Sequence, residues 1–214
     1  MNINYTHGKI DCTDCYQLED CCSNGWELHK NPGYYGSSNP KVLVLGFSKG
    51  STQMQENNFD DMAFKGMRNR LKELLVLLDF LDETIEINTL FNKDEKRFGF
   101  ASLIRCGISK DGKTSGTLIN KSFKDAKSII ETCSSKFLKE SMPESVENII
   151  LLGSSKIYKK LVMEHFKNLF GDNFVKKDND NFYTNNIHWQ FVAHPSPANG
   201  WFNKWVDDYK KAQV

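Results

Sequence analysis

Residues 194 to 197 read His194-Pro195-Ser196-Pro197 and follow the apolar run 188–193 directly. Each proline fixes its own φ and restricts the residue before it, so His194 and Ser196 are expected in extended conformations. An imidazole held in this way suits a group that must be aimed at a reacting atom. The same string also describes a strand-ending turn with a surface histidine, and the four residues alone favour neither interpretation.

The cysteines are the second group that could do chemistry. Cys12 and Cys15 form a C-x-x-C pair, Cys106 follows a predicted strand, and Cys133 lies on the next predicted helix. In a reducing compartment, cysteines serve as metal ligands or buried thiols rather than as disulfides. Cys133 also has a simpler interpretation as a small apolar residue on the buried face of its helix.

A zinc site is one way to use these thiols. Its ligands would be Cys12, Cys15, one of the neighbouring Cys21 and Cys22, and His29. The pair Cys21-Cys22 has no other assigned role and is interpreted as packing or as a redox-sensitive pair.

Length and composition bound the class of protein. The chain has 214 residues, which suits one domain, and its 28 basic and 27 acidic residues give a net charge of +1. Any nucleic-acid contact must therefore come from a local patch. The start resembles no signal peptide, and no apolar run approaches the length of a membrane span, so we expect a soluble, cytoplasmic, monomeric protein.

Strand and helix signals alternate along the chain. Apolar runs predict strands at 41–45, 86–91, 100–104, 148–153 and 187–193, and helical spacing predicts helices over 64–81, 122–139, a segment after Ser154 or Ser155, and 201–209. Residues 107–117 read as an inserted loop. Continuous apolar strands separated by helices indicate a parallel sheet covered on both faces, and therefore an α/β protein.

The residues with chemical potential fall where these strands end. Gly46, the stretch 102–106, Gly153 and His194 all come at or just after the carboxyl end of a predicted strand. Ligands of such sheets bind at this edge. We therefore expect these positions to lie close together.

The ordered motifs are similar to those of the uracil-DNA glycosylase superfamily, and most closely to its iron–sulfur branches (family 4/5-like). The family's first loop, such as GEAPG, corresponds to residues 46–50, and its PFVGxxGxLL corresponds to 63–71, with Phe64, Gly66 and Leu71 matching. The family's TNxVKCRPP corresponds to 101–106, and its final HPSP to 194–197. The resemblance covers most of the chain.

The resemblance implies a fold and a cofactor. The fold would be a single three-layer α/β/α domain over 1–214, with a central four-stranded, mostly parallel sheet. The family's four ligands correspond to Cys12, Cys15, Cys106 and Cys133, which would hold one [4Fe–4S] cluster and attach the N-terminal segment 1–38 to the core.

The resemblance also implies an activity, the hydrolysis of an N-glycosidic bond in DNA after the target base is flipped into a pocket. His194 would stabilise the negative charge on the departing base, and Phe64 would stack on that base. Gly46 and Phe47 would line the substrate site. The DNA strand would be contacted by Lys49, Ser196, Asn199 and Trp201, with Trp201 as a wedge. Helix-face packing is the alternative role for both Phe64 and Trp201.

Two departures from the family pattern shape the expected substrate. Phe47 and Ser48 stand where the family has a water-orienting Asp, Asn or Glu, and Ser102 replaces the Asn that reads uracil. A serine cannot present the paired donor and acceptor of an amide. We therefore expect a bulkier, modified pyrimidine, in repair or in defence against phage.

The water in this reaction would be held by Ser48, or by Asp60 or Asp61. The two acidic residues equally suit the N-terminal cap of the next helix. Two other functional classes stay open. One is a catalytically inactive iron–sulfur or zinc protein that binds nucleic acid or another protein, and the other is an α/β enzyme that acts on free nucleosides.

Overall fold

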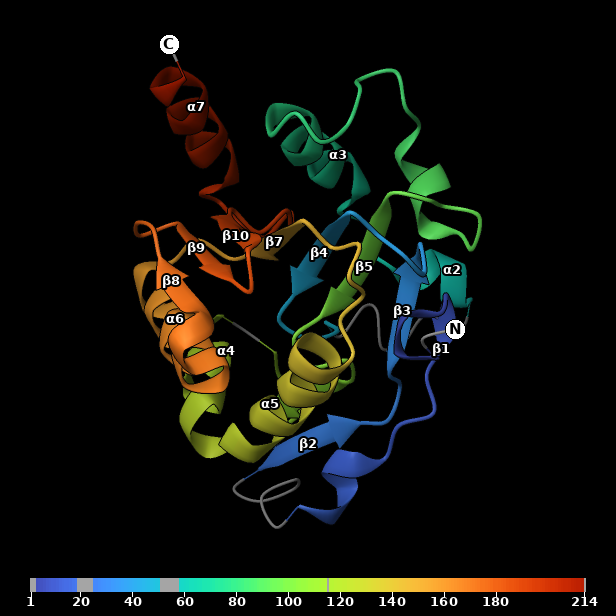
Figure 1. Ribbon diagram of the computed structural model, residues 1–214, viewed down its shortest axis with the longest axis vertical. Coiled ribbons are helices and arrows are strands. Elements are labelled where there is room, and N and C mark those ends of the chain that lie inside the picture. Colours follow the sequence, from blue (N-terminus) through green and yellow to red (C-terminus); the bar gives the residue numbers. More distant parts are fainter. Residues whose placement is uncertain (1–2, 19–24, 51–57, 115, 214) are drawn as a thin grey trace.

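The computed structural model describes residues 3–18, 25–50, 58–114 and 116–213. Its main feature is an eight-stranded sheet with the strand order β1-β3-β5-β4-β7-β10-β9-β8 (Figure 1). The strands are β1 (Gly8–Lys9), β3 (Gly33–Gly36), β4 (Val42–Gly46), β5 (Phe98–Ser102), β7 (Asn148–Leu152), β8 (Phe174–Lys176), β9 (Asn181–Thr184) and β10 (Ile187–Val192). A separate two-stranded sheet pairs β2 (Trp26–His29) with β6 (Gly107–Lys110).

The protein is therefore an α/β protein with a mixed sheet. The strands β5, β4, β7 and β10 pair in parallel. The sheet is larger than the four strands expected, because β1 and β3 extend one edge and β9 and β8 the other, all by antiparallel pairing. These edge strands are two to four residues long, too short to give a clear alternating pattern in the sequence.

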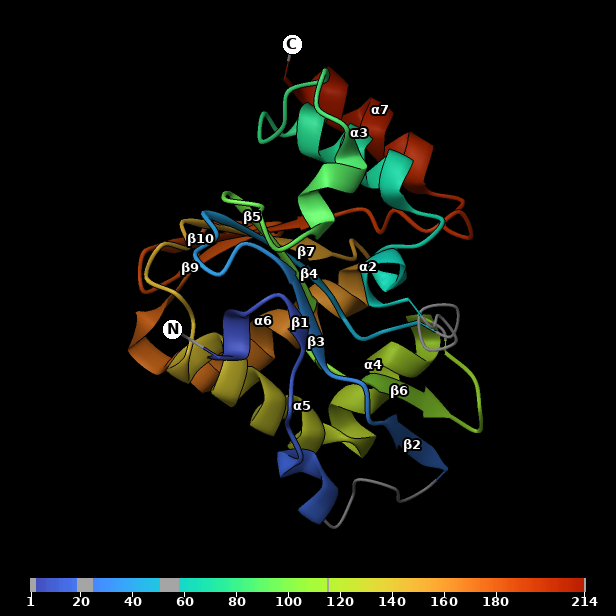
Figure 2. The ribbon, with the colours of Figure 1, turned by 90° about the vertical axis from the view of Figure 1, so that its right-hand side faces the viewer.

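Helices cover both faces of the sheet (Figures 1 and 2). The longer ones are α3 (Arg68–Leu77) and α7 (Phe202–Ala212) on one face, and α4 (Gly116–Asp125), α5 (Lys127–Ser134) and α6 (Lys156–Phe170) on the other. The shorter ones are α2 (Phe59–Met62), the π-helical turn η4 (Ser135–Glu140), and the 3-10 turns η1 (Ile3–Tyr5), η2 (Asp14–Gln17), η3 (Ile87–Phe91) and η5 (Gly171–Asn173). Within the part of the chain that the structure describes, no helix is long and apolar enough to cross a membrane.

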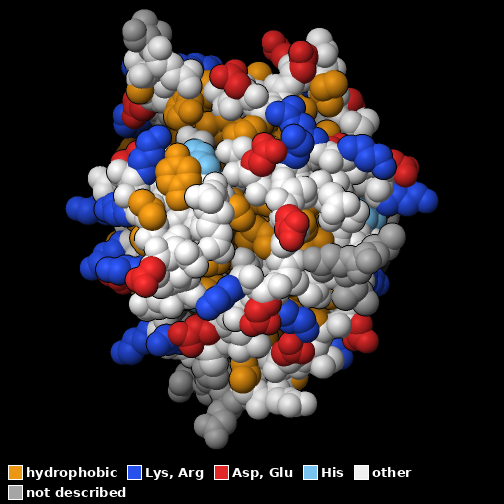
Figure 3. Space-filling model, viewed as in Figure 1, with side chains coloured by type: hydrophobic (Ala, Val, Ile, Leu, Met, Phe, Trp, Pro, Cys, Tyr) orange, Lys and Arg blue, Asp and Glu red, His pale blue; other side chains and the backbone are white. Residues whose placement is uncertain are grey.

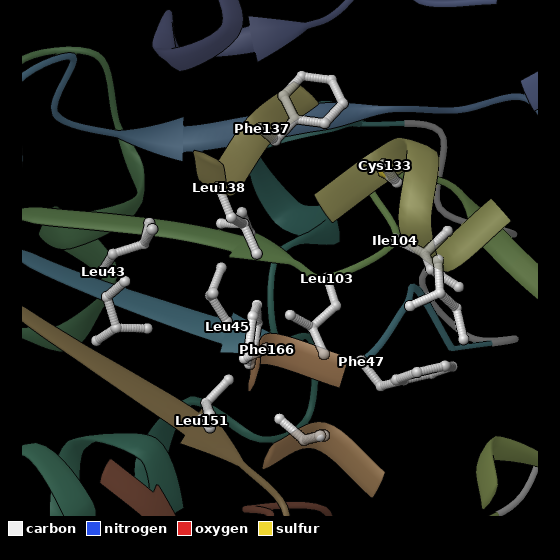
Figure 4. Packing of buried hydrophobic residues seen from close by; sticks show 14 of the residues in the cluster. Leu43, Leu45, Phe47, Leu103, Ile104, Cys133, Phe137, Leu138, Leu151 and Phe166 are labelled. Atoms are coloured by element: carbon white, nitrogen blue, oxygen red, sulfur yellow. The ribbon is translucent and has the colours of Figure 1, made fainter. Parts of the chain in front are cut away.

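Alternation along the strands produces a core on each side of the sheet. In β4, Leu43 and Leu45 belong to the core beneath α5 and α6, whereas Val42 and Val44 belong to the core beneath α3 and α7. Figure 4 shows Leu43 and Leu45 together with Leu151 of β7 in the first of these cores. Burial on both faces explains why the central strands read as continuous apolar runs.

Several sequence predictions need correction. Residues 86–91 are not a strand but contain η3, whose start is capped by the Glu86 side chain. The helix predicted over 64–81 is shorter, because Phe64 and Gly66 adopt φ of 53° and 74°, outside the helical range. The helix predicted over 122–139 is divided among α4, α5 and η4. The predicted loop at 107–117 begins with β6.

The expected meeting of strand ends is confirmed for the parallel strands. Gly46 at the end of β4 lies opposite Ser102 at the end of β5, and the Gly153 N–H donates to the Val192 carbonyl at 2.8 Å. The carboxyl ends of the four parallel strands therefore lie at one edge of the sheet, where the site is built.

Candidate functional site

A pocket of about 450 Å³, counted with its open mouth, lies at this edge. Its walls contain six of the residues that the sequence singles out, namely Gly46, Ser48, Lys49, Phe64, Ser102 and His194. The lining residues are Gly33, Tyr35, Gly46, Ser48, Lys49, Ala63, Phe64, Met67, Ala101, Ser102 and His194. Segments far apart in the chain thus meet where the motifs predict a base pocket.

His194 lies directly after β10 and is half-buried. Its Nδ1 accepts a hydrogen bond from the Ser196 N–H at 3.1 Å, so the ring is neutral with its proton on Nε2. Burial lowers the pKa of His194, which favours the same neutral form. The ring is thus prepared to donate one hydrogen bond from Nε2.

The turn that carries His194 is held in place by hydrogen bonds from two side chains. The Asn199 amide donates to the His194 carbonyl at 2.8 Å, and Arg70 Nη1 donates to the Ser196 carbonyl at 2.8 Å. The Arg70 guanidinium also lies over the Phe202 ring, 4.8 Å from its centroid. Ser196 and Asn199, predicted to contact DNA, therefore have a clear part in shaping the turn itself.

The loop after β4 divides its side chains between the pocket and the core. Gly46 and Ser48 line the pocket, whereas Phe47 is only 4% exposed and packs against Phe123 and Tyr158. Figure 4 shows Phe47 among the buried residues. Successive residues of an extended chain point to opposite sides, which explains the division. The prediction that Phe47 contacts the substrate is therefore corrected, because its ring is a core residue.

Phe64 lines the pocket and also packs against the core. Its ring centroid lies 6.0 Å from that of Phe91 and 5.9 Å from that of Phe100. Its φ of 53° is rare for a bulky side chain. Such strained positions cluster at functional sites, where the surrounding structure enforces them.

Lys49 also lines the pocket, but its side chain is buried and only 6% of the residue is exposed. Its ammonium donates to the Asn31 carbonyl. Burial lowers the pKa of Lys49 to about 8. This ammonium is held inside the wall, and the contact of Lys49 with the DNA strand stays a prediction.

Asp60 and Asp61 lie in the first turn of α2 and do not line the pocket. The Asp60 carboxylate pairs with His7 Nε2 at 3.0 Å, and the Asp61 carboxylate accepts from the Asn58 amide at 2.8 Å. Their position at a helix start matches the capping interpretation. The structure does not bring either carboxylate to His194.

Tyr35, which no sequence motif indicates, lies on β3 and lines the pocket. Its ring stacks on Phe59 at 4.3 Å, and the residue is 4% exposed. Its buried hydroxyl has no hydrogen-bond partner among the described residues. Burial raises the pKa of Tyr35, and the Asp60 charge raises it further, so the hydroxyl keeps its proton. An unused donor in a pocket wall is a group that a ligand can satisfy.

The surface near the turn offers one prominent apolar side chain, because Trp201 is 72% exposed. Such exposure is compatible with the predicted wedge and removes the alternative that its side chain is core packing. On the face drawn in Figure 3, basic and acidic side chains are interspersed.

The four cysteines of the predicted cluster lie around one part of the structure. Cys12 and Cys15 are half-buried; Cys15 lies in η2 and Cys12 shortly before it, and this turn packs against α5, which carries Cys133. Burial raises the pKa of the Cys133 thiol, and the neighbouring Cys15 and Cys106 raise it further, against the Arg105 N–H that donates to Cys133 Sγ at 3.2 Å. The four thiols therefore influence one another.

Cations surround these thiols. The Lys136 ammonium lies 3.4 Å from Cys12 Sγ, and burial raises the pKa of Cys106 while the charges of Lys49 and Lys30 lower it. As the side chains stand, no group of three or more His, Cys, Asp or Glu among the described residues is placed to hold a metal ion.

The alternative zinc site would use one of Cys21 and Cys22 together with His29. Cys21 and Cys22 lie outside the described residues. His29 uses its Nε2 in a 2.9 Å hydrogen bond with Ser109 Oγ.

Comparison with known proteins adds no relative. No protein-family model matches the chain, and no curated protein matches it. The function of the protein is therefore inferred from the geometry of the site.

Proposed function

We propose that this protein is a DNA glycosylase that hydrolyses the N-glycosidic bond of a flipped, modified pyrimidine, within a fold like that of uracil-DNA glycosylases. The observation that carries the proposal is the neutral His194, fixed by Ser196 and placed in one pocket with an aromatic wall, Phe64, and a polar edge, Ser102. This set supplies a donor, a stacking surface and a group that reads the base.

The proposed reaction breaks the bond between the base nitrogen and the sugar C1′. The bonding electrons leave with the base, and the Nε2–H of His194 donates to the base oxygen on which negative charge develops. The sugar acquires oxocarbenium character and is attacked by a water hydrogen-bonded to Ser48. The water oxygen bonds to C1′, and its lost proton neutralises the base. The products are a free base and an abasic site.

The preference for a modified base rests on Ser102. A Cβ added to Gly46 would lie 3.6 Å from Ser102 Oγ, so the two small residues adjoin and leave space at this wall. We propose that the buried Tyr35 hydroxyl, which has no partner among the described residues, donates an additional hydrogen bond to a substituent. Both features favour a pyrimidine larger than uracil. We propose that the activity serves either repair or defence against phage.

We further propose that Cys12, Cys15, Cys106 and Cys133 hold a [4Fe–4S] cluster. The residue types support this, because four cysteines can supply four thiolate ligands, and Lys136 lies 3.4 Å from Cys12 Sγ as a cation beside them. When bound, the cluster would link the N-terminal segment to the core through its cysteine ligands. The Cys106→Ser variant should lose the brown colour and melt at a lower temperature. Stoichiometric zinc without iron in the wild-type protein would contradict the cluster.

The activity is tested with DNA strands that carry single modified bases. Wild-type protein is incubated with strands containing uracil, a thymine mismatch, hydroxymethylcytosine or glucosylated hydroxymethylcytosine, and abasic sites are revealed by alkaline cleavage. We expect cleavage at a bulky modified pyrimidine and little at uracil. Full-rate cleavage at uracil would overturn the substrate argument.

A second candidate is a non-catalytic protein that binds flipped bases in DNA. None of the described residues in the pocket wall carries a carboxylate or an amide side chain, the groups that usually orient the attacking water. Tight binding to one of these strands without any abasic product would favour this candidate.

A further inference from the structure

The helix α3 begins with two arginines that its own structure does not favour. Arg68 is its first residue and Arg70 its third, and its first turn contains no acidic residue. Its N-cap residue is Met67, whose side chain has no oxygen to cap the helix. Cations at a helix N-terminus oppose the helix dipole. A local preference that is broken in this way points to a use outside the helix.

Arg68 binds the segment that precedes the helix. Its Nε donates to the Ala63 carbonyl at 2.9 Å, and its Nη2 donates to the Asp60 carbonyl at 2.7 Å. Its Nη1 donates to the side-chain oxygen of Asn88 at 2.8 Å. The three donors belong to one planar group, so these bonds fix the segment between α2 and α3 relative to the helix.

The same guanidinium supports the position of Phe64. Its central carbon lies 4.3 Å from the ring centroid of Phe91, and the Phe91 and Phe64 centroids are 6.0 Å apart. The Ala63 carbonyl that Arg68 binds belongs to the peptide bond leading into Phe64. Because a φ of 53° is unfavourable for a bulky side chain, this position needs support from its surroundings. Arg68 provides that support to both the backbone and the ring.

Arg70 binds the opposite side of the pocket. Its Nη1 donates to the Ser196 carbonyl at 2.8 Å, and the N–H of the same Ser196 donates to His194 Nδ1 at 3.1 Å. The Arg70 guanidinium also lies over Phe202, the first residue of α7, which packs beside α3 (Figure 2). Arg70 therefore holds the residue that orients the imidazole.

The position of α3 allows it to reach both sides of the pocket. Its buried leucines share a core with the residues of β4, so the helix is fixed on the sheet. Residues two positions apart on a helix do not face each other, and Arg68 and Arg70 accordingly extend toward different turns. Those turns carry Phe64 and His194, which line the same pocket.

We propose that α3 is the spacer of the pocket, and that Arg68 and Arg70 are positioning residues that hold the Phe64 ring and the His194 imidazole at a fixed separation. The inference rests on the proposed function. A planar base must stack on one group while its oxygen reaches the other. A displacement of about 1 Å at a reacting group can cost about 10²-fold in rate.

Hydrogen exchange tests the two arginines separately and without DNA. The Met67 N–H donates to the Phe64 carbonyl at 2.8 Å, so its exchange reports on that turn, and the Ser196 N–H reports on the other. Arg68→Met should accelerate exchange at the Met67 amide about tenfold and leave Ser196 unchanged. Arg70→Met should do the reverse. Both amides are followed by NMR.

Binding and rate should separate in the same way on a strand containing glucosylated hydroxymethylcytosine. Arg68→Met should weaken binding about tenfold with little change in single-turnover rate, because stacking acts in the bound state and the transition state alike. Arg70→Met should lower the rate by up to about 10²-fold with little change in binding, because His194 acts on charge that develops only in the transition state.

Lysine variants separate positioning from charge. Arg70→Lys should restore most of the rate, since one donor suffices for the Ser196 carbonyl. Arg68→Lys should restore little of the binding, since an ammonium cannot replace a planar group with three bonded nitrogens. Arg97→Met is the matched control and should behave as the wild type, because Arg97 also lies over an aromatic ring, that of Phe98, but is exposed to solvent.

Three results would overturn the inference: equal acceleration of exchange at both amides in each variant, no acceleration in either, or loss of binding and rate in the same proportion in both. A protein that cleaves no strand but shows the separated exchange pattern would refute the glycosylase proposal and support the spacer. If Arg68→Met does not fold, Arg68→Lys provides the same comparison of the two amides.

Discussion

The backbone N–H of Ser196 donates a hydrogen bond to Nδ1 of His194 at 3.1 Å. This contact exists because the two prolines hold the intervening backbone in a narrow turn. It determines the tautomer of the imidazole and leaves Nε2–H as the donor. A protonated ring would carry hydrogen on both nitrogens and lose the contact.

Replacing His194 with Ala should lower the rate of abasic-site formation by about 10²–10³, because it removes a donor to a developing anion. Binding to the same DNA should change little. His188→Ala is the control, since His188 lies on β10, the strand that precedes His194, and contacts Asn181 instead of the pocket. An equal loss of rate in both variants would indicate damage to β10 rather than loss of the donor.

The pH dependence should reflect the lowered pKa of His194, which follows from burial. A neutral ring is the active form, so activity should persist through pH 6.5, near the ordinary histidine value. It should fall only at lower pH, as the ring gains a proton. Folding stability changes in the same direction, because the unfolded chain takes up this proton first as the pH drops. A single-turnover pH profile with its midpoint above 6.5 would contradict this assignment.

Tyr35→Phe should weaken binding of target DNA and leave the fold intact or slightly more stable. Its hydroxyl has no hydrogen-bond partner among the described residues, and removing an unsatisfied buried hydroxyl costs the fold nothing. Tyr158→Phe is the matched control, because the Tyr158 hydroxyl is also buried and has no partner within the described part of the chain, but Tyr158 does not line the pocket. Affinity measured by fluorescence anisotropy should fall only in the first variant. Equal affinities would remove Tyr35 from the recognition surface.

Ser102→Asn should increase binding to uracil-containing DNA. The amide presents a donor and an acceptor side by side, which matches the edge of uracil. Excision of the wild-type substrate should decline in parallel, because the larger side chain occupies space at the Gly46 wall. Ser102→Ala separates the two effects, since it frees space without adding an amide. Unchanged affinity for uracil would place Ser102 away from the base edge.

The meeting of Gly46, Ser102 and His194 could be predicted from the sequence. Each follows a continuous apolar strand, and parallel strands end at one edge of the sheet. The prediction that they meet requires only the apolar runs that mark the strands and the rule that ligands bind at the carboxyl ends of parallel strands. The same reasoning failed for Phe47, because the direction of a side chain in the loop depends on a register that the sequence does not display.

Tyr35 could not be predicted because antiparallel pairing of β3 with β5 brings it to the pocket from a distant part of the chain. Its local sequence, two tyrosines between glycines, has no distinctive chemical signal. Asp60 is a different case, since the sequence offered two roles and the contact with His7 favours the structural one. The roles of Arg68 and Arg70 could not be predicted, because an isolated arginine reads as a surface residue until its contacts are known.

Detection of the excised base tests the proposed glycosylase activity most directly. Wild-type protein and His194→Ala are each mixed in excess with DNA containing glucosylated hydroxymethylcytosine or uracil, and the small-molecule fraction is analysed by mass spectrometry. We expect the wild type to release the modified base in a one-to-one ratio with abasic sites, and the variant to do so far more slowly. Stoichiometric binding of the DNA with no released base from any modified strand would contradict it.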